Sequence, residues 1–137
     1  MAEYVCKDKI KKEGLEGQFY IDSAATSSEE IGNPVHYGTT NILEEMNIPC
    51  GNHRAKKITK QDYDKFDYII GMEERNVEDI KRIVGKDSKN KVYKLLDFSA
   101  NPRNIADPWY TGDFNTTYHD VVEGLQAFLK YIKEEKM

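Results

Sequence analysis

The chain has 137 residues, with 20 lysines and arginines against 24 aspartates and glutamates, which gives a formal net charge of -4. This length suits one domain and is too short for two conventional ones, and the interspersed charges form no basic block, which disfavours nucleic acid as a partner. No run approaches the roughly 18 apolar residues of a membrane helix, and the N-terminus carries no secretory signal, so we expect a cytoplasmic protein that has no membrane partner.

The first half of the chain begins with an amphipathic pattern. Apolar residues recur at helical spacing over residues 2–13, and Gly14 offers a C-cap, so this segment is predicted to be a helix. The apolar burst of residues 19–21 predicts a short buried strand, and the small and polar residues 23–33 predict the loop at its carboxyl end. Another helix is expected over residues 36–46.

The second half repeats the order of strand and helix. Thr59 can cap a short helix that leads to a second buried strand over residues 68–70. A helix is predicted over residues 72–84, and a third strand over residues 92–96. A long loop over residues 97–113 then precedes the last helix, which carries a wide apolar stripe.

This order of elements predicts an α/β fold, with a parallel sheet and helices on both of its faces. We expect residues 1–137 to form a single domain. A helix that starts at Met1 has no N-cap side chain, and a free α-amino group would put positive charge at the positive end of the helix dipole. Because natural domains seldom begin in this way, we expect the domain to be N-terminally incomplete, with its first central strand missing from this chain.

The long loop carries the motif of greatest chemical interest, Asp107-Pro108-Trp109-Tyr110. Asp-Pro alone usually only starts a turn, but this loop follows the third strand, at the end of an α/β sheet where ligands bind. Trp109 and Tyr110 would form walls for a flat ring beside the carboxylate. A leaving phenolate has a pKa of about 10, so an acid beside the bridging oxygen would speed the cleavage of an aryl phosphate. Asp107 can donate that proton and afterwards accept one from water.

Further motifs, in the same order and spacing, make the chain similar to a known family. They are Met1-Ala2-Glu3, residues 22–28, Gly32-Asn33-Pro34, His53-Arg54-Ala55, residues 72–76 and residues 107–114. With these motifs the chain resembles the low-molecular-weight protein tyrosine phosphatases nearly from end to end. The resemblance implies a phosphotyrosine phosphatase I-like fold with flavodoxin-like layering. It also implies hydrolysis of phosphotyrosine in proteins, or of small aryl phosphates, through a cysteinyl-phosphate intermediate without a metal or other cofactor.

The resemblance assigns roles to individual residues. Asp107 matches the general acid, and Trp109 and Tyr110 match the aromatic loop positions that contact substrate. Ser23 and His53 match residues that hold the phosphate-binding loop in shape by hydrogen bonds.

The resemblance also marks a departure at Glu29. This acid stands where the family often has an aromatic residue that forms one wall of the pocket entrance, and Glu30 follows it. Glu29 would therefore contact the substrate next to its phosphotyrosine. We expect reduced preference for acidic phosphopeptides and a preference for basic flanking residues.

The nucleophile that the family uses is missing from this sequence. In the family, a central strand and a Cys-x5-Arg loop come directly before the segment that matches Met1-Ala2-Glu3; the thiolate attacks phosphorus while the arginine and backbone amides hold the phosphate. Neither cysteine replaces that loop. Cys6 is expected to be a core residue of a helix without the necessary glycine, and the segment after Cys50 has Lys56 where an arginine is needed. Cys50 is expected at an ordinary apolar position.

Three interpretations follow from the missing loop. The first is an N-terminally truncated phosphatase that is inactive as written. The alternative is a non-catalytic phosphatase-like interaction module that binds partners through the aromatic loop, although the presence of Asp107, Ser23 and His53 argues against it. The third, an arsenate reductase of the same fold, is disfavoured because those enzymes need additional redox cysteines.

The missing strand would also affect folding. In the sheet of the family, the first strand lies between the second and the third. Its loss would separate residues 19–21 from residues 68–70 and expose strand edges that are prone to pairing. We expect a marginally stable, partly molten or strand-swapped chain that self-associates through these edges.

Overall fold

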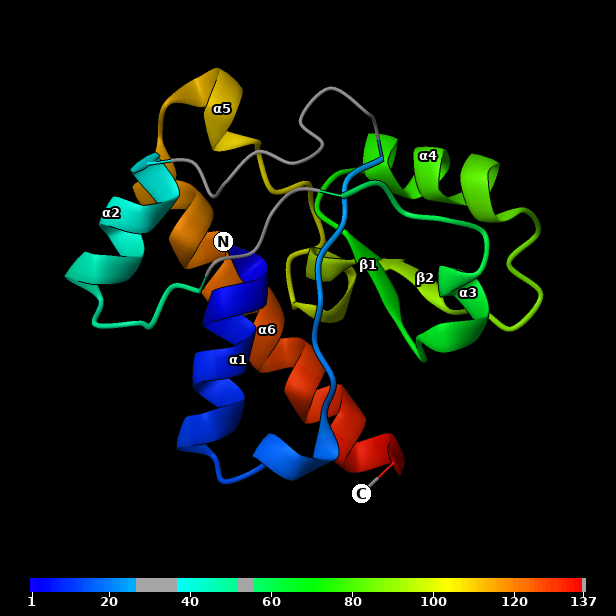
Figure 1. Cartoon of the computed structure of the whole chain (residues 1–137), viewed down its shortest axis with the longest axis horizontal. Coiled ribbons are helices and arrows are strands. Elements are labelled where there is room, and N and C mark those ends of the chain that lie inside the picture. The colour runs from blue at the N-terminus through cyan, green and yellow to red at the C-terminus, as the bar shows by residue number, and fades with distance from the viewer. Residues whose placement is uncertain (27–36, 52–55, 137) are drawn as a thin grey trace.

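The computed structural model describes residues 1–26, 37–51 and 56–136. Within these residues, helices surround two short strands (Figure 1). The elements are, in chain order, α1 (Ala2–Lys12), η1 (Glu16–Gln18), α2 (Tyr37–Glu45), α3 (Asp62–Lys65), β1 (Ile69–Gly71), α4 (Glu74–Val84), β2 (Val92–Lys94), η2 (Leu95–Phe98), α5 (Pro108–Thr111) and α6 (Phe114–Lys136), where η marks a 3-10 helix.

The two strands are parallel neighbours, in a register that pairs Ile69 with Val92. Parallel neighbours need a crossover connection, and α4 supplies it. This helix begins where the Asn76 side chain accepts hydrogen bonds from the backbone N–H groups of Met72 and Glu73, at 3.2 and 2.9 Å. The cap satisfies donors that the first turn of a helix leaves unpaired, so it marks the point where β1 ends and α4 starts.

Helices cover both faces of the strands, which confirms the predicted α/β class (Figure 1). One apolar cluster joins α3 and α4 to the strands and contains Ile58, Tyr63, Ile69, Val77, Ile80, Val84 and Val92. A larger cluster joins α1, α2 and η2 to α6, and its most deeply buried members include Leu43, Leu95, Leu96, Ile105, Val121 and Leu129. Full burial of one such side chain contributes about 1.5–3 kcal/mol, so both clusters stabilise the described fold.

An aromatic group connects the strands to α6. The Tyr68 ring meets the Phe128 ring edge to face, with 5.2 Å between their centroids. Phe98 lies 5.0 Å from Phe128 and 5.1 Å from Tyr93, again between ring centroids. Such pairs add about 0.5–1.5 kcal/mol each beyond simple burial, so they fix α6 against this face of the sheet.

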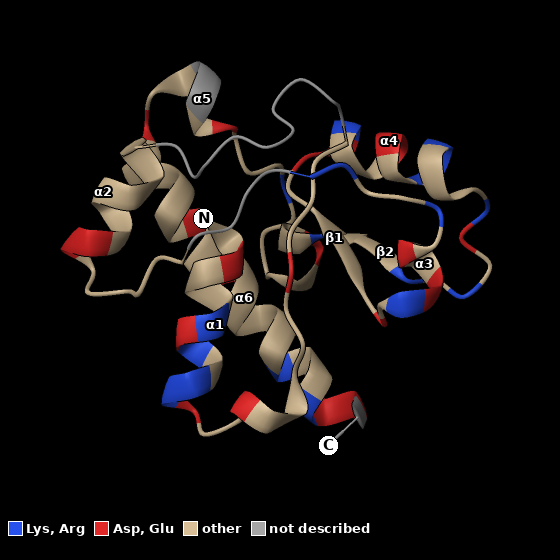
Figure 2. Ribbon diagram, in the orientation of Figure 1, with Lys and Arg blue, Asp and Glu red and all other residues tan. Residues whose placement is uncertain are grey.

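The charged residues of the helices are interspersed, as the sequence predicts (Figure 2). On α1, Lys7 pairs with Glu3 at 2.6 Å and Lys12 pairs with Asp8 at 2.9 Å, each one helical turn apart. Pairs at this spacing stabilise a helix by a few tenths of a kcal/mol. Within the described residues, no helix is both long enough and apolar enough to cross a membrane.

The helices predicted over residues 2–13, 36–46 and 72–84 are confirmed as α1, α2 and α4, and the strand predicted over residues 68–70 is confirmed as β1, shifted by one residue. The short helix after Thr59 is confirmed as α3. Its predicted cap is wrong, because the Thr59 hydroxyl donates to the Asp62 side chain at 3.2 Å and one turn of chain separates it from the helix.

The prediction of a buried strand over residues 19–21 is wrong for the described structure. Phe19 has extended backbone angles, φ -133° and ψ 138°, but the segment belongs to no strand, and the Tyr20 side chain is 69% exposed. A strand exists only through pairing, and the pairing here begins later, in an isolated parallel bridge between Ala25 and Lys57. Of the loop predicted over residues 23–33, the part from residue 27 onward lies outside the described residues.

The third predicted strand is shorter than expected. β2 ends at Lys94, and Leu95 and Leu96 turn into η2, where both are almost fully buried. The Asp97 carboxylate accepts a hydrogen bond from the Lys94 N–H at 3.1 Å, which favours the helical turn over a continued strand. An apolar run alone does not distinguish these two outcomes.

Candidate active site

The loop that follows η2 leads to the short helix α5 (Figure 1). Asp107 is the last residue of this loop, because α5 begins at Pro108. It is exposed, and its carbonyl oxygen accepts a hydrogen bond from the Thr111 N–H at 3.3 Å. Pro108 starts α5, where its fixed φ suits the first turn and its missing N–H costs no helical hydrogen bond. Gly112 follows the helix with a φ of 73°, in the left-handed region that favours glycine. Asp107 therefore stands at the start of a tight, well-formed helical turn.

Contacts to β1 and α4 hold the residues before Asp107. The Ile105 N–H donates to the carbonyl oxygen of Met72 at 2.9 Å, and the Ile105 side chain is buried. The Asn104 side-chain oxygen accepts a hydrogen bond from the Glu74 N–H at 3.0 Å. Because Met72 follows β1, these contacts place the loop at the carboxyl end of that strand, the end of an α/β sheet where ligands bind.

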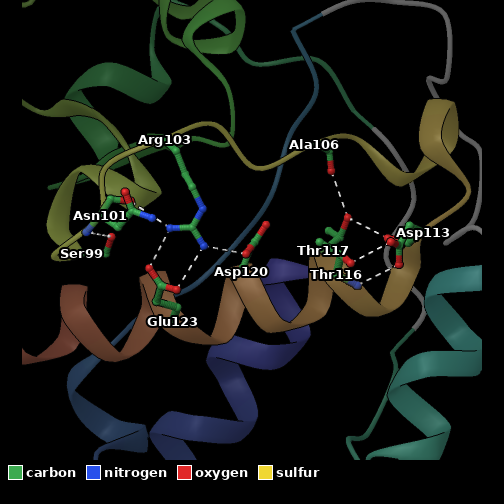
Figure 3. A network of polar contacts seen from close by, with 9 residues as sticks. All are labelled: Ser99, Asn101, Arg103, Ala106, Asp113, Thr116, Thr117, Asp120 and Glu123. Atoms are coloured by element: carbon green, nitrogen blue, oxygen red, sulfur yellow. Dashed lines mark hydrogen bonds and ion pairs between the residues drawn. The ribbon is translucent and has the colours of Figure 1, made fainter.

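Further contacts of the loop go to the first turn of α6 (Figure 3). The Thr117 hydroxyl donates to the carbonyl oxygen of Ala106 at 3.0 Å. The Asp113 carboxylate accepts hydrogen bonds from the backbone N–H and the hydroxyl of Thr116, at 3.0 and 2.7 Å. These two hydrogen bonds hold the pKa of Asp113 below its ordinary value. Asp113 thus satisfies an orphan donor of α6 and closes the segment that contains Asp107 and α5.

A second polar group surrounds the N-terminal turn of α1. The Ser23 hydroxyl donates to one carboxylate oxygen of Glu3 at 2.5 Å, and the Lys7 ammonium donates to the other at 2.6 Å. Glu3 is 7% exposed, and its hydrogen bond raises the pKa of Lys7. The sequence motifs predict no role for the Glu3 side chain. An acidic residue in the first turn of a helix, four residues before a lysine, is the signal that could have indicated one.

A shallow hollow of about 310 Å³ lies beside this group, between α1 and the extended segment before Ser23. Its lining consists of Glu3, Tyr4, Lys7, Tyr20, Ile21, Asp22 and Gly51. A Cβ atom on Gly51 would lie 3.2 Å from the Tyr4 ring, so only glycine leaves this wall of the hollow open without displacing the ring. Lys56 donates to Asp22 at the rim.

The predicted site residues fall into separate contact groups. Ser23 belongs to the group around Glu3, whereas Asp107 belongs to the loop on α6. His53 and Glu29 lie outside the described residues, as do the side chains of Trp109 and Tyr110, whose backbone is part of α5. Their roles therefore stay predictions.

The two cysteines differ in their environments. Cys6 is 8% exposed on α1, as expected of a core residue, and burial raises the pKa of its thiol to about 11. Such a thiol is scarcely ionised at neutral pH and is a poor nucleophile. The expectation that Cys50 occupies an apolar position is wrong, because it is exposed where the chain leaves the core after Ile48. Among the described residues, no group of three His, Cys, Asp or Glu side chains could hold a metal ion.

The sequence of the chain matches characterised proteins over nearly its whole length. The family model for low molecular weight phosphotyrosine protein phosphatase matches residues 1–137. The chain is 35% identical over 138 residues to the low molecular weight protein-tyrosine-phosphatase YfkJ of Bacillus subtilis, and the match covers 99% of this chain and 88% of the relative. It is 38% identical over 135 residues to the low molecular weight phosphotyrosine protein phosphatase of Gallus gallus, a match that covers 95% and 85% of the two chains.

Solved structures give the same result. The crystal structure of YfkJ from Bacillus subtilis superposes with a TM-score of 0.95 at 34% identity, over 99% of this chain and 87% of that one. The low molecular weight protein tyrosine phosphatase from Streptococcus pyogenes superposes with a TM-score of 0.81 at 34% identity, over 99% and 83% of the two chains. The resemblance predicted from the motifs is confirmed, and the chain belongs to the low molecular weight phosphotyrosine protein phosphatase family.

Proposed function

We propose that this chain supplies the general acid for the hydrolysis of phosphotyrosine and of small aryl phosphates, and that Asp107 is that acid. The observation that carries the proposal is the placement of Asp107. It is exposed at the start of α5, at the carboxyl end of β1, on a loop whose preceding residues are each held by a contact. A positioned carboxylic acid that protonates a leaving phenolate contributes about 10²–10⁴-fold to the rate.

We propose in addition that the 137 residues are inactive by themselves, because they contain no Cys-x5-Arg loop. Activity would then need such a loop placed before Met1, where it would meet the N-terminus of α1. The positive end of the helix dipole favours a bound phosphate at that position. The proposed roles of Ser23 and His53 are to support that loop, and those of Trp109 and Tyr110 are to contact the aryl ring.

Glu29 carries the proposal about selectivity. An acid at the pocket entrance repels acidic residues that flank phosphotyrosine and attracts basic ones. The test compares hydrolysis of an acidic and a basic phosphopeptide of equal length, by a protein in which a Cys-x5-Arg loop has been added before Met1 and by its Glu29→Gln variant. The variant should lose the preference for the basic peptide; equal rates for the two peptides before the substitution would contradict it.

The central test adds the proposed nucleophile loop to the chain. A β-strand followed by a Cys-x5-Arg loop is fused before Met1, and phenyl phosphate hydrolysis is compared between this fused protein and the 137-residue chain. We expect activity in the fused protein alone. Asp107→Asn in the fused protein should lower kcat for phenyl phosphate by about 10²-fold or more, and far less for 2,4-dinitrophenyl phosphate, whose leaving group needs no proton.

Three results would count against this proposal. Equal activity of the 137-residue chain and the fused protein would show that the nucleophile is already present, and Cys50→Ser would then be the next variant to assay. An Asp107→Asn fused protein with unchanged kcat on phenyl phosphate would show that Asp107 is not the acid. A folded but inactive fused protein that still binds phosphotyrosine peptides would favour a non-catalytic interaction module.

A further inference from the structure

Arg103, four residues before Asp107, binds two carboxylates on α6 (Figure 3). Its guanidinium donates to both carboxylate oxygens of Glu123, at 2.9 and 3.1 Å, and to Asp120 at 2.8 Å. It also donates to the carbonyl oxygen of Asn101 at 2.9 Å, within the loop itself. A planar guanidinium that meets a carboxylate with two parallel hydrogen bonds is held in orientation as well as in position.

The residues between Arg103 and Asp107 are held one after another. Asn104 accepts a hydrogen bond from the first turn of α4, Ile105 donates one to the residue after β1, and Ala106 accepts one from α6. The loop has no regular secondary structure here, yet every residue from 103 to 106 has a fixed partner. The place of Asp107 is therefore set by these contacts rather than by a helix or strand of its own.

The part of α6 that receives Arg103 is itself fixed. Gly124, the neighbour of Glu123, packs against η2 so closely that a Cβ atom on it would lie 2.5 Å from Cγ of Leu95. Since η2 leads directly into the loop, the start of the loop and the partners of Arg103 are held against each other. Arg103 thus connects the loop to a part of α6 that is itself packed against η2.

An exposed ion pair usually contributes little to stability, and a purely structural role for Arg103 would follow from that rule. This arginine differs because it connects an irregular loop to a neighbouring helix with three hydrogen bonds, four residues before the acid. We propose that Arg103 is a positioning residue for Asp107, and that it holds residues 103–106 on α6 so that the carboxyl group stands within reach of the bridging oxygen. The inference rests on the proposed function of Asp107.

Kinetics of the fused protein distinguish a positioning role of Arg103 from a purely structural one. Arg103→Gln should lower kcat for phenyl phosphate at least about tenfold more than kcat for 2,4-dinitrophenyl phosphate, because a displaced acid harms only the substrate that needs a proton. KM should change little for either substrate. The matched control is Arg82→Gln on α4, whose guanidinium is exposed and pairs with Asp79 at 2.8 Å; both rates should stay at their original values.

Conservative variants separate the effect of the paired hydrogen bonds of Arg103 from the effect of its positive charge. Arg103→Lys keeps the positive charge but loses the paired hydrogen bonds, so its kcat for phenyl phosphate should lie between those of the parent and Arg103→Gln. Glu123→Gln removes the charge of the partner while leaving its shape, and should reproduce the Arg103→Gln effect at smaller size. It also serves as the second variant if Arg103→Gln fails to fold.

Amide hydrogen exchange in the fused protein gives a readout without catalysis. In Arg103→Gln, the N–H of Ile105 and the N–H of Thr111, which donates to Asp107, should exchange faster. The N–H of Ile69, which donates to Lys91 at 2.9 Å, should keep its rate. Unchanged exchange at Ile105 and Thr111 would overturn the inference.

The failure of this inference can be distinguished from failure of the proposed function. If Asp107→Asn shows no dependence on the leaving group, the assignment of the acid is wrong and the argument about Arg103 falls with it. If Asp107→Asn shows that dependence, while Arg103→Gln lowers kcat equally for both substrates, Asp107 is the general acid and Arg103 has only a structural role.

Discussion

The Thr117 hydroxyl donates a hydrogen bond to the carbonyl oxygen of Ala106 at 3.0 Å, so the first turn of α6 holds the residue directly before Asp107. The same hydroxyl lies 3.2 Å from the carbonyl oxygen of Asp113, at the far end of the segment. A hydroxyl has one proton to share between these acceptors. Thr117 is buried, at 7% exposed. Because its hydroxyl can bond to either carbonyl oxygen, this one side chain connects both ends of the segment that contains Asp107 and α5.

Thr117→Val should therefore destabilise the chain. Valine keeps the shape but removes the donor, and the loss of one such hydrogen bond costs about 0.5–1.5 kcal/mol in free energy of unfolding. Thr117→Ser keeps the hydroxyl and is the control. Urea unfolding of the fused protein measures both; a valine variant as stable as the parent would show that the hydroxyl contributes nothing here.

Gly124→Ala should also destabilise, against the usual preference of helices for alanine. Alanine gains about 1 kcal/mol over glycine in a helix, but the new Cβ atom would overlap Leu95, and overpacking a buried site costs about 1–3 kcal/mol. Gly17→Ala is the matched control, because a Cβ atom on Gly17 meets nothing within 4 Å. Thermal unfolding compares the two variants, and a raised Tm for Gly124→Ala would refute the close contact.

The elements that the sequence predicts well are those whose signal is local. The helices over residues 36–46 and 72–84 follow from apolar spacing, which depends only on neighbours along the chain. The strand over residues 19–21 fails because a strand depends on a distant partner, and the segment has none among the described residues. The short helix α5 has too few residues for a periodic pattern, so it was expected to be loop.

The residues of the candidate site also differ in how well the sequence predicts them. Asp107 is recognisable because its motif is contiguous and sits after a predicted strand. Arg103 is not, because its partners Asp120 and Glu123 lie on a later helix, and only the fold brings them to the loop. The contact between Ser23 and Glu3 was missed for the same reason, since neither residue signals the other in sequence.

The cap of α6 should make stability depend on pH. The hydrogen bonds from Thr116 hold the pKa of Asp113 below its unfolded value. The ionised group therefore stabilises the folded chain at pH values above its unfolded pKa of about 4, and this contribution is lost as the pH falls through the lower, folded pKa. The urea midpoint of the fused protein should thus exceed that of Asp113→Asn at pH 6, and the difference should shrink towards pH 3.

Thr116→Ser keeps both donors and should follow the parent at every pH. If the urea midpoints of the parent and Asp113→Asn differ by the same amount across this pH range, the charge of Asp113 does not contribute to stability.

The open edge of β1 leads to the last prediction. Among the described residues, β1 has β2 as its only partner strand, and Tyr20, on the extended segment before Ser23, is 69% exposed. Unpaired strand edges recruit other strands, so we expect the 137-residue chain to self-associate and to unfold over a broad range of urea. Sedimentation should show a mass that rises with concentration, whereas the fused protein, in which the added strand can pair with the open edge, should be monomeric and unfold sharply. Tyr20→Lys should reduce association, because it replaces an exposed aromatic side chain with a charged one. A monomeric 137-residue chain with a sharp cooperative transition would mean that the described elements form a complete core without a further strand.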